Sequence, residues 1–222
     1  MKEKIFTGAG VAIVTPFKGP DNRQVDFEKL DEIIEAQING NTDAIIICGT
    51  TGEASTMPDD EHLAVIKRCV DTVNHRIPVI AGTGSNDTVH AVKLSRSAEK
   101  LGADALLSVT PYYNKTTQAG LYEHFKAIAE SVSVPIILYN VPGRTNLNID
   151  PATMEKLCKI PNINAVKECN ISQLYDVINR CGDELNIYSG EDGQVFYPTV
   201  AGGQGVISVI SNIAPKFMHD MV

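Results

Sequence analysis

The sequence lacks the features that mark several large classes of protein. It has no run of basic residues, and its formal net charge is -8, which argues against a nucleic-acid surface and against an anionic membrane surface. The apolar stretch near the N-terminus is short and soon broken by Pro16, so it predicts neither a signal peptide nor a membrane span. We therefore expect small-molecule partners, and neither nucleic acid nor membrane.

Patterns typical of metal sites and disulfides are missing as well. The cysteines are five in number, scattered and without a C-x-x-C pair, so they indicate neither a zinc site nor a disulfide framework. The histidines share no motif, and we interpret them as surface or structural residues. These patterns predict a cytoplasmic protein without a bound metal. The residues concerned are Cys48, Cys69, Cys158, Cys169 and Cys181, and His62, His75, His90, His124 and His219.

The chain contains, instead, short apolar runs with helix-like segments between them. Within each run the hydrophobicity is continuous rather than alternating, which is typical of strands that are buried on both faces of a parallel sheet. Eight runs are predicted as strands, and they are Gly10–Phe17, Asp43–Cys48, Pro78–Gly84, Asp104–Pro111, Pro135–Pro142, Asn164–Glu168, Asn186–Asp192 and Gly205–Val209.

The segments between the runs have the end signals of helices. Asp26 is placed to cap a helix that ends near Gly40, and Asn86 or Asp87 starts another. This alternation predicts a (β/α)8 TIM barrel, an α/β fold, with residues 1–222 as a single domain. A doubly wound open sheet is the alternative, but the stretch "AGTGSND" lacks the third glycine of the dinucleotide-binding signature. In the helix that follows Pro58, we expect the inward residues to be Leu63, Ile66, Val70 and Val73.

The last strand-helix unit looks short. Only "ISNIAPKFMHDMV" follows the eighth run, so the last helix, which begins near Ala214 or Pro215, would have about two turns. We expect a truncated eighth unit whose flank of the barrel is either exposed or covered by a partner.

Polar residues gather at the predicted C-terminal ends of the strands. In a (β/α)8 barrel these ends converge on one pocket, which holds the active site. The stretches supply threonines, tyrosines, one arginine and the lysine at a strand end, without the cluster of histidines or acids that a metal needs. They are "GTTGEAS" (49–55), "TPYYNK" (110–115), "YNVPGRT" (139–145), Lys167 and "SGEDG" (189–193).

Lys167 is the most informative of these residues. A lysine that is desolvated inside a barrel pocket has a lowered pKa, and its neutral amine can attack a carbonyl carbon. The alternatives are a lysine that extends its ammonium to solvent, or one that pairs with Glu168. A nearby phenol and a loop that can bind a carboxylate favour the chemistry of imine formation.

The neighbouring residues also have two interpretations each. "GTTG" can offer hydroxyls and backbone N–H groups to a carboxylate, or can be an ordinary turn. Tyr139 can relay protons or can be a core tyrosine, and Arg144 can bind a carboxylate or lie in solvent. Tyr112 and Tyr113 can equally serve a subunit interface.

Six stretches, in this order, resemble the dihydrodipicolinate synthase family: "GTTGEAS", "TPYYNK", "ILYNVPGRT", "VKE", "SGED" and "GGQGVISVISNIAP". The resemblance runs from about Gly8 to the end of the chain. The family is a class I aldolase-like branch of the N-acetylneuraminate lyase superfamily. The resemblance implies a lyase of lysine biosynthesis by the diaminopimelate route, which condenses pyruvate with L-aspartate 4-semialdehyde to give 4-hydroxy-tetrahydrodipicolinate.

The resemblance also implies catalytic roles. Lys167 would form the Schiff base with pyruvate, and no cofactor beyond this covalent imine is expected. Tyr139 would relay protons at the imine, linked through Thr51 to Tyr113. In this family that last tyrosine comes from the neighbouring subunit, so a homo-oligomer is expected, a tetramer as in the family or a dimer.

Further residues would bind the substrates by the same resemblance. Thr50 and Thr51 would hold the carboxylate of pyruvate, and Arg144 the carboxylate of the semialdehyde. Main-chain groups of Gly190 and Ile207 would lie close to the lysine. The alternatives are a related Schiff-base aldolase, such as an N-acetylneuraminate or keto-sugar-acid lyase, and a truncated, catalytically impaired form.

The sequence departs from the family in two places. The family continues beyond the eighth strand through a full last helix and a small helical C-terminal domain, and this chain stops at Val222. In members inhibited by lysine, a histidine and a glutamate contact the inhibitor, and the corresponding positions here are Asp59 and His90. Loss of the glutamate removes an acceptor for the ammonium of lysine, so we expect weak or no inhibition by lysine.

Overall fold

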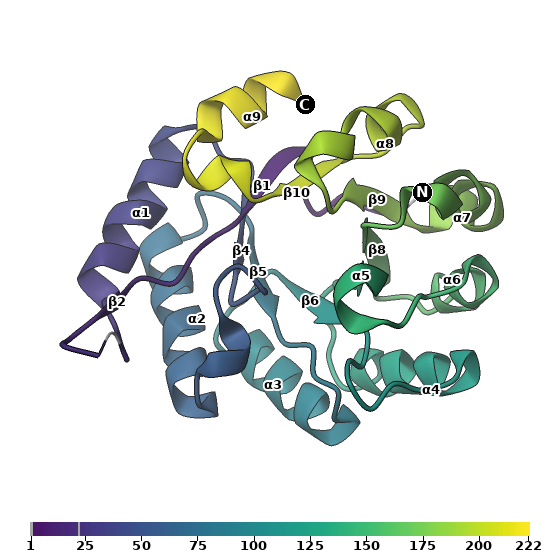
Figure 1. The fold of residues 1–222 in the computed structure, drawn as a ribbon, viewed down its shortest axis with the longest axis horizontal. Coiled ribbons are helices and arrows are strands. Elements are labelled where there is room, and N and C mark those ends of the chain that lie inside the picture. The colour runs from purple at the N-terminus through teal and green to yellow at the C-terminus, as the bar shows by residue number, and fades with distance from the viewer. Residues whose placement is uncertain (1, 22) are drawn as a thin grey trace.

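The computed structural model describes residues 2–21 and 23–222, and in these residues parallel strands close into a barrel (Figure 1). β1 pairs with both β10 and β4, which closes the sheet and excludes the open-sheet alternative. The predicted (β/α)8 barrel is confirmed. Its strands are β1 (Gly8–Ala12), β4 (Ala44–Ile47), β5 (Val79–Gly82), β6 (Ala105–Val109), β7 (Ile136–Asn140), β8 (Ile163–Glu168), β9 (Asn186–Ser189) and β10 (Gly205–Ser208).

Helices follow the strands and surround the barrel (Figure 1). A short helix, α5 (Pro142–Thr145), lies in the connection after β7, and β2 (Phe17–Lys18) and β3 (Gln24–Val25) form a small antiparallel pair after β1. The surrounding helices are α1 (Phe27–Asn39), α2 (Asp59–Val73), α3 (Thr88–Lys100), α4 (Gln118–Ala129), α6 (Pro151–Leu157), α7 (Leu174–Cys181), α8 (Phe196–Val200) and α9 (Pro215–Met221).

The predicted helix ends are formed by the expected residues. The Asp26 side chain accepts a hydrogen bond from the backbone N–H of Lys29, and α1 ends at Gly40. Asp87 caps α3 in the same way through the N–H of Val89. These caps satisfy backbone donors that a helix leaves without partners in its first turn, so the local sequence determines where the helices start.

Two local predictions were wrong. The first strand was expected over Gly10–Phe17, but β1 ends at Ala12. Beyond it the chain leaves the sheet, because the N–H of Val14 donates to the Asn212 side chain and Pro16 has no N–H to give.

The inward face of α2 was also misjudged. Ile66 and Val73 are fully buried as expected, whereas Leu63 and Val70 are only partly buried. The buried face includes Val65, Cys69 and the side chain of His62. A buried face that is predicted from periodicity alone can differ from the real one by a rotation about the helix axis. The packing of the neighbouring elements decides which residues of the helix are buried.

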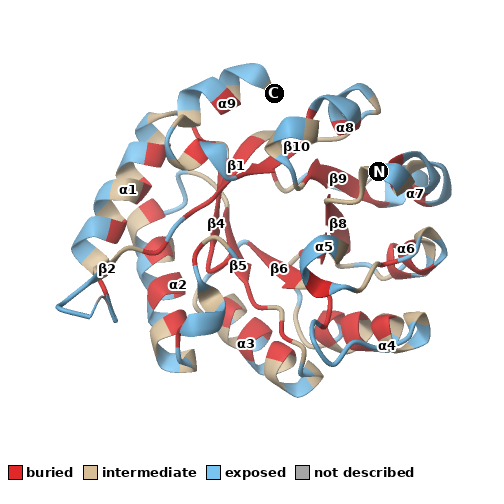
Figure 2. Cartoon of the chain, in the orientation of Figure 1, coloured by how far each residue is buried: buried red, intermediate tan, exposed pale blue. Residues whose placement is uncertain are grey.

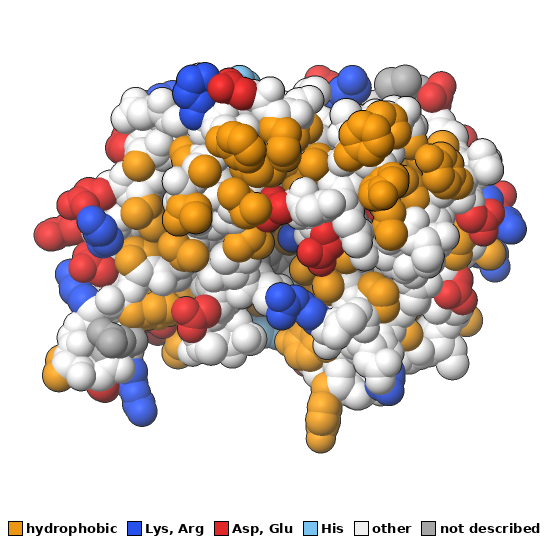
Figure 3. Space-filling model, turned by 45° about the horizontal axis from the view of Figure 1, so that its top comes forward, with side chains coloured by type: hydrophobic (Ala, Val, Ile, Leu, Met, Phe, Trp, Pro, Cys, Tyr) orange, Lys and Arg blue, Asp and Glu red, His pale blue; other side chains and the backbone are white. Residues whose placement is uncertain are grey.

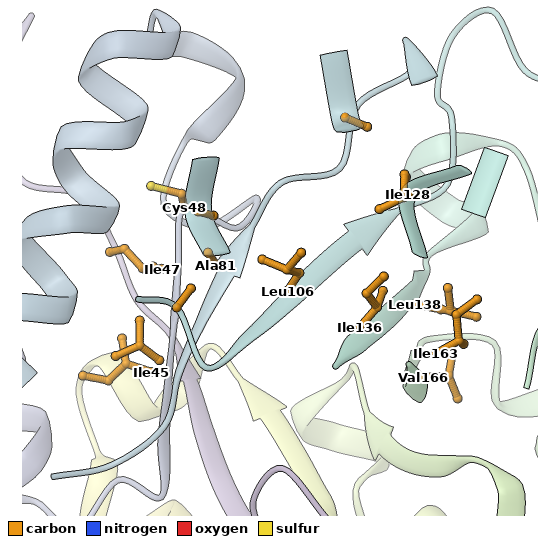
Figure 4. Packing of buried hydrophobic residues seen from close by; sticks show 14 of the residues in the cluster. Ile45, Ile47, Cys48, Ala81, Leu106, Ile128, Ile136, Leu138, Ile163 and Val166 are labelled. Carbon is orange, nitrogen blue, oxygen red and sulfur yellow. The ribbon is translucent and has the colours of Figure 1, made fainter. Parts of the chain in front are cut away.

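Two layers of apolar side chains fill the fold. The strands are buried on both faces, whereas the helices are exposed on their outer side (Figure 2). Small and branched residues such as Ala12, Ile80 and Ala165 fill the barrel interior. The layer between strands and helices contains Ile45, Ile47, Leu106, Leu138 and Val166 among others (Figure 4). Along β7 and β8, successive residues therefore alternate between these two layers.

The flank of the barrel beside α8 and α9 exposes many apolar side chains, which gather in the upper part of Figure 3. The last helix is short as expected, since α9 spans Pro215–Met221. Across the described residues, no helix has both the length and the apolar character needed to cross a membrane. The exposed apolar residues of this flank are Phe196, Tyr197, Val200, Val209, Ile210, Ile213, Phe217 and Met221.

Candidate active site

Lys167 lies inside the C-terminal end of the barrel. It is the penultimate residue of β8, and its side chain is 5% exposed. Ala165, two residues earlier, belongs to the apolar cluster of the barrel interior, and side chains two apart in a strand point to the same face. The interpretation of Lys167 as a lysine that extends into solvent is therefore wrong.

Tyr139 lies directly beside Lys167. The two residues are paired in the register of β7 and β8, and the Lys167 Nζ lies 4.4 Å from the centre of the Tyr139 ring. Tyr139 also lines a cavity of about 460 Å³ that opens at the C-terminal ends of the strands. The amine and the phenol are thus in one place, and the phenol faces the space that a substrate can occupy.

The protonation of both groups is shifted by their surroundings. Burial lowers the pKa of Lys167 from its ordinary value of 10.5, while Cys169, Glu191 and Asp192 partly oppose this change. Burial raises the pKa of Tyr139 above its ordinary value of 10.0. A larger fraction of the amine is therefore neutral, and the phenol keeps its proton at neutral pH, as nucleophilic attack and proton donation require.

The turn after β4 places Thr50, rather than Thr51, next to Tyr139. Thr50 lines the same cavity as Tyr139, and its side chain lowers the pKa of Tyr139 against the larger effect of burial. Thr51 is not among the residues that line this cavity. Successive residues of a tight turn point in different directions, so Thr50 is the threonine that shares the cavity with Tyr139, and the relay through Thr51 stays a prediction. Binding of a carboxylate by Thr51 stays a prediction.

Arg144 reaches the same cavity from α5. α5 starts at Pro142, two residues after the last residue of β7, and its C-cap residue is Asn146, whose φ of 52° reverses the chain. The guanidinium is exposed to solvent at the mouth of the site, where it can pair with an incoming anion. No ion pair between Arg144 and a carboxylate of the described residues competes with this.

Gly190 lies beside Lys167, and the closeness of Ile207 to the lysine stays a prediction. The N–H of Gly190 donates to the Glu168 carbonyl at 2.8 Å. A Cβ at Gly190 would overlap the Cys169 Sγ and would lie 3.2 Å from the Lys167 Cγ. Ile207 is fully buried in the barrel interior. Gly190 therefore leaves the room that the Lys167 side chain occupies.

Replacement of Gly190 by alanine should disturb Lys167. We expect a loss of about 1–3 kcal/mol in the free energy of unfolding from the overlap, together with slower modification of Lys167 by pyruvate and borohydride. Gly193→Ala is the control, because a Cβ there meets nothing within 4 Å. Adding Cys169→Ala to Gly190→Ala should restore part of the stability, and a Gly190→Ala variant as stable and reactive as the parent would contradict the assignment.

Tyr113 is outside this site. Its side chain is 92% exposed, and its backbone has a φ of 67°, a left-handed conformation within the "TPYYNK" loop. The neighbouring Tyr112 lines the cavity instead. Within one chain, the structure therefore brings together Lys167, Tyr139 and Thr50 but leaves Tyr113 apart.

Glu168 and Cys169 are neighbours of Lys167 that the sequence analysis did not assign to the site. Glu168 is buried, but its carboxylate accepts hydrogen bonds from Asn140, Asn170 and Gln173, which argues against the alternative in which Lys167 pairs with Glu168. Burial raises the pKa of Glu168 to about 7, although these hydrogen bonds lower it. Strand alternation could have shown that Glu168 points away from Lys167.

The arm of the cavity near α2 and α3 holds Asp59 and His90. The Asp59 carboxylate lies 2.8 Å from the His90 Nε2 and 3.0 Å from the Lys93 Nζ, and hydrogen bonds from these two residues lower its pKa. The acid at this place is already paired with basic groups. It therefore cannot offer a free acceptor to the ammonium of a ligand.

Inhibition by L-lysine should be weak or absent for this reason. The ammonium of a lysine ligand would have to displace the Lys93 ammonium from the Asp59 carboxylate. The ligand would also be repelled by the positive charge of Lys93. Steady-state rates with increasing L-lysine would test this expectation, with Asp59→Asn as a variant that removes the paired carboxylate. Strong inhibition of the unmodified chain would contradict it.

The donor set of the site is that of carbonyl chemistry with an amine. In the described part of the chain, no group of three or more histidine, cysteine or acidic side chains is placed to hold a metal ion. The amine of Lys167, the phenol of Tyr139 and the guanidinium of Arg144 can together bind and activate a small keto acid.

Comparison with known proteins identifies the family. The model of the dihydrodipicolinate synthetase family matches residues 5–222. The chain belongs to this family. A 4-hydroxy-tetrahydrodipicolinate synthase from Acetivibrio thermocellus is 62% identical over the whole of this chain and 75% of its own length. The chain thus spans about three quarters of the length of this relative, and the predicted family resemblance is confirmed.

Solved structures of the dihydrodipicolinate synthetase family agree with this. The chloride-inhibited dihydrodipicolinate synthase from Acinetobacter baumannii, solved in complex with pyruvate, is 46% identical and has a TM-score of 0.93 over 96% of this chain and 74% of its own. A monomeric dihydrodipicolinate synthase variant is 43% identical and has a TM-score of 0.93, over 98% and 73% of the two chains. The barrel described above is therefore the barrel of the family.

Proposed function

We propose that this chain is a Schiff-base-forming lyase that condenses pyruvate with L-aspartate 4-semialdehyde to give 4-hydroxy-tetrahydrodipicolinate, a step of the diaminopimelate route to lysine. The observation that carries the proposal is the buried Lys167 against the ring of Tyr139, at the active-site end of a barrel of this family. N-acetylneuraminate and keto-sugar-acid lyases are not favoured, because the relatives over the full chain are 4-hydroxy-tetrahydrodipicolinate synthases.

The geometry supports a sequence of steps at Lys167. Its neutral amine attacks the keto carbon of pyruvate, and loss of water gives a protonated imine. The imine draws electrons from the methyl group, which loses a proton to give an enamine. The enamine carbon forms a bond to the aldehyde carbon of the semialdehyde. The amino group of that substrate then attacks the imine carbon, closes the ring and releases Lys167.

Two neighbouring side chains move protons in these steps. Tyr139 gives a proton to the hydroxyl that leaves as water, and Thr50, which lines the same cavity, connects Tyr139 to the next donor. The turn of Thr50 and Thr51 binds the carboxylate of pyruvate through hydroxyl and backbone N–H groups. These roles rest on the side-chain positions and on the family.

The position of Arg144 fits the carboxylate of the semialdehyde. Replacement by alanine should lower kcat/KM for the semialdehyde by about 10–100-fold, since a charge-assisted hydrogen bond of this kind contributes about 1.5–3 kcal/mol. The rate at which this variant forms the pyruvate imine should change much less. Arg96→Ala, an exposed arginine of α3, is the control. If Arg144→Ala slowed imine formation with pyruvate as much as it lowered kcat/KM for the semialdehyde, Arg144 would not act on the second substrate alone.

The exposed Tyr113 supports a homo-oligomer in which it completes the relay of a second copy. Sedimentation of the chain with and without pyruvate would test this, with Tyr113→Phe as the activity probe. A monomer with full activity would contradict it.

We also propose a cytoplasmic location, because the five cysteines are free thiols in the structure and fit a reducing compartment.

The direct test of the proposed function is covalent trapping. The protein is incubated with pyruvate and reduced with borohydride, and the modified peptide is found by mass spectrometry. We expect one pyruvate adduct, on Lys167, and consumption of the semialdehyde by the unreduced protein. No adduct would contradict the proposal. An adduct without turnover of the semialdehyde, but with cleavage of N-acetylneuraminate or a keto-sugar acid, would assign the chain to a related lyase.

A further inference from the structure

A cluster of buried and half-buried polar side chains lies behind the ends of β7 and β8, on the side away from the cavity. We call it the Glu168 cluster. Asn140 and Glu168 directly follow Tyr139 and Lys167, and the four residues form two successive pairs of the strand register. Because side chains alternate along a strand, the cluster faces the helices while the active-site pair faces the barrel interior. Its members are Asn140, Asn148, Glu168, Asn170 and Gln173.

Glu168 is the acceptor at the centre of the cluster. Its Oε1 accepts from the Asn140 Nδ2 at 2.8 Å and from the N–H of Asn170 at 2.7 Å, and its Oε2 accepts from the Gln173 Nε2 at 2.9 Å. These donors come from β7, from the turn after β8 and from the following 3-10 turn, η2 (Ile171–Gln173). One carboxylate thus joins the ends of two adjacent strands to the chain that follows them.

The cluster also reaches the connection that carries Arg144. The Asn140 Oδ1 accepts from the N–H of Ile149 at 3.0 Å, and the Gln173 Nε2 donates to the carbonyl of Ile149 at 3.1 Å. Ile149 lies in the segment by which the chain returns from α5. The same network therefore fixes both ends of the α5 connection.

We propose that Glu168 is a positioning residue for the reaction at Lys167, which holds the ends of β7 and β8 and the α5 connection so that Lys167, Tyr139 and Arg144 keep their mutual arrangement. The proposal rests on the proposed function. Glu168 does not touch the substrate, since its side chain lies on the opposite face of β8. Its effect is on the geometry in which the amine and the phenol meet, and small displacements of reacting groups have large effects on rate.

The donors around Glu168 explain why a carboxylate stands here. All three partners donate N–H groups, so every one needs an oxygen at this place. A glutamine would turn an NH2 group toward one of them. If this NH2 group faced the Gln173 Nε2, Gln173 could not relieve the contact by rotating its own amide. The Gln173 Oε1 already accepts from Asn148, and the Gln173 Nε2 already donates to the carbonyl of Ile149. A buried carboxylate is thus required in spite of its desolvation.

The test compares Glu168→Gln with a matched variant on the same strand. Asn164→Asp lies at the other end of β8, where the Asn164 Nδ2 donates to the carbonyl of Glu3 and its Oδ1 accepts from Asn186. Each substitution replaces one hydrogen bond by a contact between like groups. For the full chain of each variant, the melting temperature and the rate of pyruvate trapping at Lys167 are measured, the rate by borohydride quenching over a range of pyruvate concentrations.

We expect both variants to have lower melting temperatures. The trapping rate at saturating pyruvate should fall by about 10–100-fold for Glu168→Gln only, with little change in the half-saturating pyruvate concentration. The double variant Glu168→Gln/Gln173→Glu restores a donor facing an acceptor between these two residues but loses the donation to the Ile149 carbonyl, so it should recover only part of the rate. If Glu168→Gln traps pyruvate as fast as Asn164→Asp, or if both lose rate in proportion to stability, the inference is overturned.

A milder variant keeps the inference testable if Glu168→Gln does not fold. Gln173→Ala removes one donor from a half-buried position and leaves the other two hydrogen bonds of Glu168 in place. A slower trapping rate, at temperatures where Gln173→Ala is fully folded, supports the inference, and an unchanged rate overturns it. A parent chain that forms no adduct overturns the proposed function, and the inference falls with it. A parent adduct with unaffected variants overturns the inference alone.

Discussion

Replacing Lys167 by alanine should abolish the condensation of pyruvate with L-aspartate 4-semialdehyde. The expected decrease in kcat is on the order of 10⁵-fold or more, as for loss of the nucleophile in other enzymes that work through covalent intermediates. The reason is that every step from the imine to ring closure takes place on the Lys167 nitrogen, and no other lysine is seen in the barrel interior of the described residues. Steady-state assays with both substrates measure the decrease.

The fold of this variant should survive. Lys167 is buried with a lowered pKa, so its removal leaves a small cavity but releases the protein from burying an amine. Circular dichroism and melting should therefore show a folded chain, and trapping with pyruvate and borohydride should give no adduct. Lys159→Ala, an exposed lysine that pairs with Glu184, is the control and should keep full activity. Substantial turnover by folded Lys167→Ala would refute the assignment of the nucleophile.

Replacing Tyr139 by phenylalanine should lower kcat by about 10²–10⁴-fold, the usual contribution of a positioned proton donor. The ring stays against the Lys167 amine in this variant, so the surroundings that lower the pKa of the lysine are largely kept. What is lost is the hydroxyl, which burial keeps protonated. Both the trapping rate and kcat are expected to fall, because dehydration to the imine needs that proton.

Tyr188 offers a matched control for the tyrosine. It is also a buried tyrosine of the barrel interior and is paired with Lys167 in the register of β8 and β9, but its hydroxyl donates to the carbonyl of Phe6 at 2.8 Å, in the segment before β1. The hydroxyl also accepts from the N–H of Phe6 at 3.2 Å, so Tyr188→Phe removes two hydrogen bonds and should lower stability by about 1–3 kcal/mol while kcat stays nearly unchanged. If Tyr188→Phe and Tyr139→Phe reduced kcat equally, Tyr139 would have no special role in proton transfer.

Much of the site could be predicted from the sequence. The pattern "NAVKE" places a lysine where a buried strand ends, and "LYNVPGRT" does the same for a tyrosine. In a closed parallel barrel both strand ends face one pocket, which is why Lys167 and Tyr139 were expected together and are found in contact. The resemblance to the family added roles that neither strand pattern nor spacing supplies.

Other parts of the site could not be predicted in this way. Thr50 and Thr51 are adjacent, and only the geometry of the turn decides which hydroxyl meets Tyr139. Glu168 was considered as a partner of Lys167, and its real partners are Asn140, Asn170 and Gln173. These outcomes depend on the direction of side chains and on contacts between distant segments, which local sequence does not determine.

The sequence by itself determined the order and the nature of the elements. Continuous apolar runs produce strands that are buried on both faces, and residues such as Asp26 and Asp87 start helices through local hydrogen bonds to the backbone. These signals act within a few residues of the chain. They are therefore readable before any packing is known.

Only the tertiary structure decided how the elements combine into a site. The register of β7 and β8 places Tyr139 opposite Lys167, and closure of the barrel removes both from water. The lowered pKa of Lys167 follows from that burial, and so does the need for the hydrogen-bonded carboxylate of Glu168 on the other face of the strand. Desolvation and register are properties of the assembled barrel, because they arise from residues that are far apart along the chain.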